Sequence, residues 1–494
     1  MRFSEWTPEE PGRILDLRPP GAVLDLIRYY GGDVPPIVDE VFGQAYTHRA
    51  QTAVIEYRYV DPDYRSEHSQ FYSKTFRRYP SVAHRIHFFQ DPPPDGWEGQ
   101  DELPLDFSDM AAGYLGYTVL RPLAGARVGR TVIAPPSQIR EQVTCFARDH
   151  VNVFGVPMSV LAAPFMAQDA QLGVCAHMSL WTTAYFHHLA YGTPRFTAAQ
   201  VGEVVPTDLG VGRSAPSTGL TVHQLAAGCR GLGLPALVYR CREPGDLPVG
   251  ESIPTVCCRY LNSGMPVIVA AGRKHAFVLV GYERVDQGTE NERIHFIRQD
   301  DEAGPYGVVE DFAHDKYGPW EYLIVPLPAK LFLPGEVAES MGQERILEAL
   351  RSSSDEQILE DYAKATQSGM GREISFRSTA IRSNRFKETL SERGFEPDAV
   401  AAYRRMQLPR WIWVVEAIRR SERADHVPAV LAESIIDATD HGRDPHALAW
   451  RAAGVLWSWL PDEDKVGFRT LAPMGLVDSV ARWVGDEPLA VQPG

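Results

Sequence analysis

The stretch GMPVIVAAGRKHAFVLVGY, residues 264–282, decides the fold of this chain. Its two apolar runs, 265–272 and 275–282, flank a short turn that contains a glycine and two basic residues. Valine-rich runs separated by a turn are typical of neighbouring strands in a sheet. A third run, RIHFIRQDD at 293–301, follows after a longer loop. We therefore predict an antiparallel meander, with His275 at the rim of the sheet where the middle strand begins.

A buried helix is predicted upstream of this meander. The segment GVCAHMSLWTTAYFHHLAYG, residues 173–192, is apolar along its length and ends in a glycine, which commonly terminates a helix. Cys175 stands at the beginning of this helix. Unpaired N–H groups and partial positive charge at a helix N-terminus favour the thiolate. We therefore expect Cys175 to have a lowered pKa and to act as a nucleophile.

The strand register supplies a partner for His275. If the second and third strands pair antiparallel with Tyr282 opposite Arg293, then His275 falls opposite Asp300. A carboxylate there can accept the imidazole N–H, fix its tautomer and stabilise the imidazolium. A slip of one residue would place Asp301 there instead. We expect Asp300 to hold this position and keep Asp301 as the alternative.

A thioester mechanism also needs hydrogen-bond donors for the oxyanion that develops on the substrate carbonyl. The backbone N–H of Cys175 is one candidate. A side-chain amide shortly upstream is the other, and both Gln168 and Gln171 offer one. We expect Gln168, because the segment between it and Cys175 can loop back over the start of the helix, and we keep Gln171 as the alternative.

Taken together, these residues resemble the papain-like cysteine peptidase superfamily. Within it, the nearest resemblance is to bacterial domains that cleave bacteriocin leader peptides after a double glycine. The resemblance covers roughly residues 160–328. It implies that Cys175 is the nucleophile, His275 the base, Asp300 the group that orients the base, and Gln168 the oxyanion donor.

The predicted fold class is α+β in three domains. A chain of 494 residues is too long for one hydrophobic core. We expect a mixed α/β domain over 1–155, a papain-like domain of helices packed on an antiparallel sheet over 156–328, and a mixed domain over 329–494. The flanking domains are predicted to contain strands and helices, the strands at 53–60, 84–89, 114–122, 130–135, 373–381, 410–418 and 429–439 and the helices at 19–30, 331–351, 354–367 and 446–460.

Composition narrows the class of protein. The net charge of −15 argues against a non-specific nucleic-acid binder, which needs a basic surface. Six cysteines in so long a chain do not indicate a disulfide framework, and since they form no CxxC pair, no structural zinc site is expected. The N-terminus has no apolar signal-peptide core, and no run is long enough to span a bilayer. We expect a cytoplasmic protein that uses no metal or cofactor and contacts neither nucleic acid nor membrane.

The leading functional hypothesis is a cysteine peptidase that hydrolyses a peptide or isopeptide bond through a thioester intermediate. A deamidase or a transglutaminase-like acyl transferase with the same triad is the first alternative. A non-catalytic binding or scaffold protein is the second. The expected partner is a protein or peptide substrate. Because the flanking domains carry no recognisable chemistry, we expect them to select that substrate or a protein partner.

Overall fold

The structure is a computed structural model, and the residues it describes fall into two compact units. The first unit comprises Met1–Asp246, Pro266–Glu283 and His295–Pro326, and the second comprises Leu247–Met265, Arg284–Ile294 and Leu327–Gly494. No helix in the described part of the chain is long and apolar enough to cross a membrane. The described residues are 3–31, 37–94, 108–123, 125–169, 174–205, 219–272, 275–285, 292–352, 356–367, 373–419, 429–440, 446–452, 454–460, 465–470 and 477–484.

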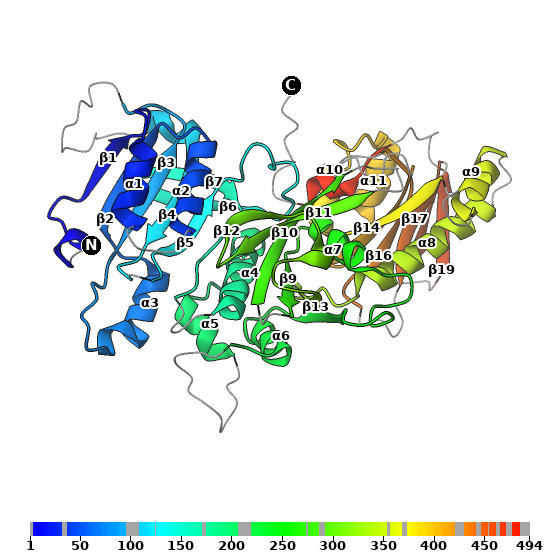
Figure 1. Ribbon diagram of the computed structural model, residues 1–494. Coiled ribbons are helices and arrows are strands. Elements are labelled where there is room, and N and C mark those ends of the chain that lie inside the picture. Colours follow the sequence, from blue (N-terminus) through cyan, green and yellow to red (C-terminus); the bar gives the residue numbers. More distant parts are fainter. Residues whose placement is uncertain are drawn as a thin grey trace. The chain divides into compact units, whose positions relative to one another are not determined.

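The first unit begins with an antiparallel sheet whose strands follow one another in chain order. Helices α1 (Ala22–Gly31) and α2 (Ile37–Thr47) lie on one face of it (Figure 1). The helix predicted at 19–30 and all the strands predicted in this region are confirmed. The five strands are β1 (Gly12–Asp16), β2 (Thr52–Tyr59), β3 (Ala83–Phe89), β4 (Tyr114–Leu120) and β5 (Val128–Ile133).

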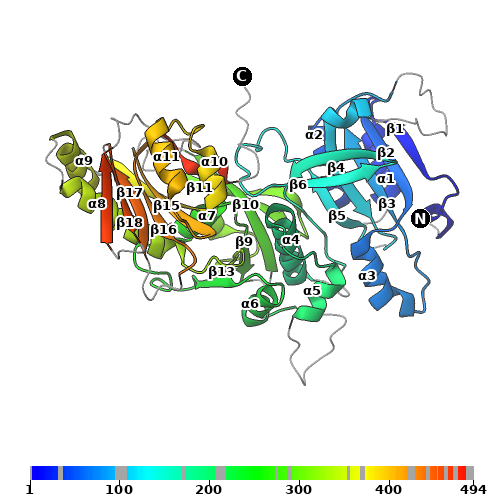
Figure 2. The ribbon, with the colours of Figure 1, turned by 180° about the vertical axis from the view of Figure 1, so that it is seen from behind.

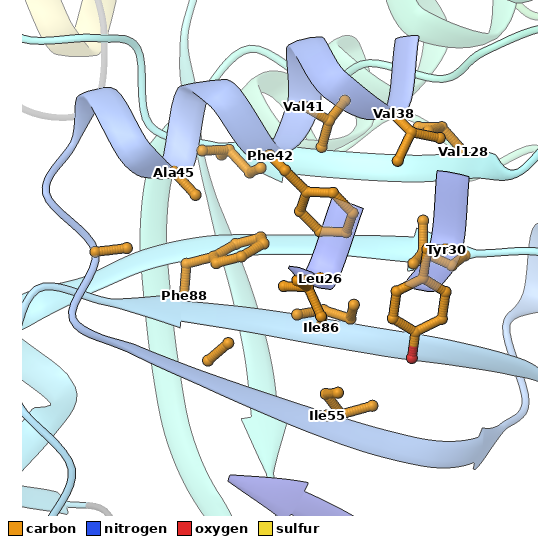
Figure 3. Packing of buried hydrophobic residues seen from close by; sticks show 14 of the residues in the cluster. Leu26, Tyr30, Val38, Val41, Phe42, Ala45, Ile55, Ile86, Phe88 and Val128 are labelled. Carbon is orange, nitrogen blue, oxygen red and sulfur yellow. The ribbon is translucent and has the colours of Figure 1, made fainter. Parts of the chain in front are cut away.

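The core between these helices and the sheet is formed mainly by apolar side chains. Figure 3 shows the ring of Phe42, from α2, directed toward Phe88 of β3 and Leu26 of α1. Each such side chain contributes about 1.5–3 kcal/mol when it is fully buried. The core therefore anchors both helices to the sheet. Its members that the figure labels are Leu26, Tyr30, Val38, Val41, Phe42, Ala45, Ile55, Ile86, Phe88 and Val128.

A second sheet carries the predicted meander. Its strand order is β12-β11-β10-β9-β13-β8, and β9 pairs antiparallel with β10 so that His275 lies opposite Ala271. The three strands predicted from the sequence correspond to β9, β10 and β11 and are confirmed. The strands are β8 (Ala236–Arg240), β9 (Val267–Ala271), β10 (His275–Val285), β11 (Arg293–Asp300), β12 (Gly304–Val309) and β13 (Trp320–Pro326).

Helix α4 (Cys175–Tyr191) packs against β9 and ends at Gly192, whose φ of 68° gives the left-handed cap that glycine favours. The predicted helix is confirmed over this range. Helix α5 spans Ala198–Val204, and α6 spans Val222–Gly231 and begins with a capping box between Thr221 and Gln224.

Buried polar contacts fix α4 in place. Trp181 of α4 donates its indole N–H to Asp63 Oδ1 at 2.9 Å, and Arg195 pairs with Asp63 Oδ2 at 2.8 Å. Asp63 belongs to α3 (Pro62–Gln70), and its side chain is almost fully buried. The hairpin of β6 (Ala147–Val153) and β7 (Val156–Ala162) also holds α4, because β6 packs against this helix.

The second unit is built on another antiparallel sheet, of order β14-β15-β16-β17-β18-β19, with β20 paired to β16. Helices α8 and α9 cover one face and α10 and α11 the other (Figure 2). Its elements are α7 (Ile253–Asn262), α8 (Gly335–Arg351), α9 (Glu356–Thr366), β14 (Ile374–Arg382), α10 (Ser383–Thr389), α11 (Pro397–Arg405), β15 (Trp411–Arg419), β16 (Ala429–Asp437), β17 (Ala447–Ala452), β18 (Val455–Leu460), β19 (Lys465–Thr470) and β20 (Val477–Asp478).

The helix predicted over 446–460 is wrong, because this segment forms the antiparallel strands β17 and β18. Gly454 lies in the turn between them with a φ of 78°, a left-handed conformation that interrupts a helix. Trp450 and Trp457 pair directly across the two strands with their rings stacked. This cross-strand pairing, which depends on the neighbouring strands, outweighs the helical spacing of the apolar residues.

A fully buried ion cluster lies in this second unit. Arg393 donates to Glu416 at 3.1 Å and to Glu433 at 3.0 Å, and all three side chains are 0% exposed. Tyr403 donates its hydroxyl to Glu433 at 2.7 Å. Because the cluster joins α11 to β15 and β16, it fixes the register of the helix on the sheet.

Candidate active site

The candidate nucleophile opens α4. Cys175 is the first residue of this helix, and Val174 before it is extended and provides no side-chain cap. The thiol is partly buried. It accepts hydrogen bonds from the backbone N–H groups of Ala276 and Ala176. Since Ala276 directly follows His275 in β10, the start of the helix lies against the start of that strand.

The thiol does not have the lowered pKa that the helix position predicted. Burial, together with the negative charge of Asp301, raises the pKa of Cys175 to about 12. The two backbone N–H groups act in the opposite direction but are outweighed. That expectation is therefore wrong, because the helix N-terminus acts locally, whereas burial and the carboxylate come from the surrounding fold. The resting thiol is protonated at neutral pH.

His275 and Asp300 form a buried pair. The imidazole Nε2 lies 2.9 Å from Asp300 Oδ1, and the two side chains are 5% and 0% exposed. Asp301 Oδ1 is farther from the same nitrogen, at 3.9 Å. Of the two carboxylates left open by the register argument, Asp300 is therefore the direct partner. With Nε2 donating to Asp300, the lone pair of Nδ1 is available as a base.

Several neighbours hold Asp300 in its charged form. Burial disfavours the charge, but the hydrogen bond and charge of His275, with Arg298, keep the pKa of Asp300 below its usual range. Arg298 Nε lies 3.2 Å from Asp300 Oδ2. The backbone N–H of Glu302 donates to Asp300 Oδ1 at 3.1 Å.

Tyr317 contacts both members of the pair. Its ring stacks on His275 with centroids 3.8 Å apart, and its hydroxyl donates to Asp300 Oδ1 at 3.2 Å. Sequence reasoning missed Tyr317, which lies in a loop with no pattern to mark it. Arg298 was also missed, although it lies two residues before Asp300 on the same strand, a spacing that places both side chains on one face.

Asp301 lies in the same cluster but is differently placed. Its side chain is 3% exposed, and neither carboxylate oxygen has a hydrogen-bond partner among the described residues beyond its own backbone N–H. Burial and the charges of Asp300 and Glu302 raise the pKa of Asp301 well above its usual value. This carboxyl group therefore favours the protonated form more strongly than its neighbour does.

The candidate oxyanion donor also reaches the cluster. The side-chain amide of Gln168 donates to Glu302 Oε1 at 3.2 Å. That same oxygen lies 3.9 Å from His275 Nδ1. Gln168 and the imidazole of His275 thus share a neighbour in Glu302, whereas the alternative, Gln171, lies outside the described residues. Glu302 is a third residue that sequence reasoning missed.

The cluster also offers donors to a metal ion. One atom each from His275, Asp300 and Asp301 lie within 4.8 Å of one another. However, two cations already flank Asp300, since Arg298 Nε lies at 3.2 Å and Lys316 Nζ at 4.0 Å from its Oδ2. A divalent ion would meet their positive charge and compete for the same carboxylate. The donor set therefore fits an ion-paired imidazole and carboxylate better than a metal centre.

The geometry thus combines a helix-end thiol, an imidazole oriented by a carboxylate and a nearby side-chain amide, which are the parts that acyl transfer through a thioester requires. No protein-family model, no curated protein and no solved structure matches this chain.

Proposed function

We propose that this chain is a papain-like cysteine peptidase that hydrolyses a peptide or isopeptide bond. The observation that carries the proposal is the hydrogen bond from His275 Nε2 to Asp300 at 2.9 Å. The residue after His275 in β10, Ala276, donates its backbone N–H to the thiol of Cys175, so base and thiol lie at the same end of this strand. The catalytic domain is proposed to be residues 156–328, as the sequence resemblance implies. A helix packed on an antiparallel sheet supports that assignment.

In the proposed reaction the sulfur of Cys175 forms a bond to the substrate carbonyl carbon, and the thiol proton passes to Nδ1 of His275. The amide of Gln168 and backbone N–H groups at the start of α4 stabilise the oxyanion. His275 then returns the proton to the leaving amine as the carbon–nitrogen bond breaks. Water, deprotonated by His275, hydrolyses the thioester and releases the thiol. Asp300 stabilises the imidazolium throughout.

The raised thiol pKa gives this reaction a specific order. Because burial raises the pKa of Cys175 to about 12, the resting thiol is protonated. Proton transfer to His275 therefore accompanies attack on the substrate rather than preceding it. The carboxylate of Asp300, which Arg298 helps to keep charged, stabilises the imidazolium that forms at that moment.

The test compares the wild-type chain with Cys175→Ala on a proteome-derived peptide library, with products identified by mass spectrometry. We expect new chain ends with the wild type and none with the variant. Cys241→Ala, which removes the other partly buried cysteine, is the matched control and should retain activity. Release of ammonia without cleavage would support the deamidase or acyl-transferase alternative, and an unchanged library, with no labelling of Cys175 by a thiol-reactive epoxide, would support a binding role.

A further inference from the structure

Glu302 occupies a position that the proposed reaction needs for its substrate. Its Oε1 accepts the amide of Gln168 at 3.2 Å and lies 3.9 Å from His275 Nδ1. One carboxylate oxygen thus sits between the candidate oxyanion donor and the free nitrogen of the candidate base. A substrate oxyanion that formed beside Gln168 would meet this negative charge and would compete with it for the amide.

Among the residues that the structure describes, no arginine or lysine pairs with Glu302. Within the described part of the chain, no arginine or lysine nitrogen lies within 4 Å of its carboxylate, whose only ion-pair contact is the imidazole of His275. The contrast is Asp300, which lies within reach of both Arg298 and Lys316. For Asp301, beside it, the imidazole at 3.9 Å is the one cationic partner among the described residues. Asp301 and Glu302, whose charges both act on the thiol of Cys175, thus differ from Asp300 in having no arginine or lysine partner in the described part of the chain.

Glu302 is also able to move. Its side chain is 48% exposed, whereas those of Asp300 and Asp301 are 0% and 3% exposed. A half-exposed carboxylate can rotate toward solvent without breaking core packing. It can also turn toward an arriving positive charge, which would release the amide of Gln168 for the substrate.

We propose that Glu302 selects substrates that carry a positive charge, a lysine or arginine side chain, next to the carbonyl that Cys175 attacks. The substrate cation pairs with the Glu302 carboxylate and draws it away from Gln168. A neutral or acidic substrate leaves the carboxylate in place, and the oxyanion position stays occupied. Glu302 thereby acts as a specificity-determining residue, and this role rests on the function proposed above.

The first experiment tests charge selection without needing a substrate. Cys175 is modified with three methanethiosulfonate reagents of similar size, one cationic, one neutral and one anionic, and the rates are read at this residue by mass spectrometry. We expect the cationic reagent to react at least about tenfold faster than the anionic one. Glu302→Gln should reduce that ratio by about tenfold.

Glu310→Gln is the matched control, because Glu310 is an exposed glutamate just beyond β12 and its substitution changes the net charge equally. The ratio should stay at the wild-type value in this variant. Equal ratios in Glu302→Gln and wild type would overturn the proposal. A failure of all three reagents to modify Cys175 would overturn it as well.

The second experiment uses fluorogenic peptides that differ only in lysine against norleucine at the residue whose carbonyl is attacked. We expect Glu302→Gln to lower kcat/KM for the lysine peptide by about tenfold and to raise it for the norleucine peptide. If no peptide is cleaved by any form while the reagent ratio depends on Glu302, the peptidase function fails and charge selection at the thiol stands. If peptides are cleaved with no dependence on Glu302, the peptidase stands and the selection fails.

Discussion

The ring of Tyr317 stacks on the imidazole of His275 with a centroid separation of 3.8 Å, and its hydroxyl bonds to the carboxylate that orients that imidazole. A single loop residue thus restrains both members of the buried pair. Arg298, on the strand of Asp300, lies with its guanidinium 5.2 Å from the centroid of the same ring. The orientation of the base therefore depends on a residue distant from it in sequence.

Removing this restraint should impair the site in two steps. Tyr317→Phe keeps the stacked ring and loses the hydrogen bond to Asp300, so we expect a loss of a few fold in the rate at which a thiol-reactive epoxide inactivates Cys175. Tyr317→Ala loses both contacts, and we expect a loss of about 10²-fold. Inactivation rates measured at saturating and at limiting epoxide concentrations separate an effect on the positioning of His275 from an effect on epoxide binding. Equal effects of the two substitutions would show that stacking contributes nothing.

The two neighbouring aspartates should behave differently. Asp300→Asn removes the direct partner of His275, so the epoxide inactivation rate should fall by at least about 10²-fold. In Asp301→Asn the inactivation rate should not fall below that of the wild type. The carboxylate of Asp301 lies farther from the imidazole, and its charge opposes formation of the thiolate. The reverse ranking would assign the orienting role to Asp301.

Asp301 should lower stability at neutral pH. A folded-state pKa raised above the unfolded value of about 4 means that protonation favours the folded state. Its stabilising contribution is therefore complete below pH 4 and is lost as the pH rises. Asp301→Asn should raise the free energy of unfolding by about 1–3 kcal/mol at pH 8 and change it little near pH 4. Urea unfolding at both pH values measures this, and Glu310→Gln should show no such difference.

The thiol should titrate far above an ordinary cysteine. Alkylation by iodoacetamide requires the thiolate, and burial raises the pKa of Cys175 to about 12. The alkylation rate at this residue should therefore rise by about tenfold for each pH unit between pH 7 and pH 10 without reaching a plateau. Glutathione, with a pKa near about 8.5–9, should level off within the same range. A plateau in the alkylation rate of Cys175 below pH 9 would contradict a thiol that is protonated at neutral pH.

The buried cluster of the second unit should contribute strongly to stability. Arg393→Met leaves Glu416 and Glu433 buried without their main cationic partner, which should cost about 3–5 kcal/mol. Arg345→Met is the control, because its pair with Glu348 is exposed on both sides and should be worth at most about 1 kcal/mol. Chemical denaturation of the two variants gives the comparison. Similar losses would indicate that the cluster relaxes to admit water.

Local sequence signals account for much of the observed site. The apolar runs and the turn before His275 predicted β9, β10 and β11, and the register argument selected Asp300. These features depend on residues close together in sequence. The contacts of Tyr317, Arg298 and Glu302 could not be predicted in the same way, because they require knowing how the loops beyond β11 return to the strand.

The two errors have a common physical cause. The segment 446–460 has apolar spacing that suits a helix, yet it forms two strands of the sheet, and Trp450 and Trp457 pair across them. The helix-end position of Cys175 suits a thiolate, yet burial and Asp301 reverse the effect on its pKa. In both places a tertiary environment outweighs a local preference.

The chain passes repeatedly between its two compact units, and this limits how the protein can be divided. Helix α7 belongs with the unit that otherwise begins at Leu327, and it lies between segments of the other unit in sequence. Within its own unit, Arg259 of α7 bonds to Ser378 at 3.1 Å. A single proteolytic cut near residue 326 would therefore leave α7 on the N-terminal fragment, separated from the rest of its unit. Expressing the two sides of that cut as separate proteins would not yield the two compact units. The two units therefore have to be produced and folded as one chain.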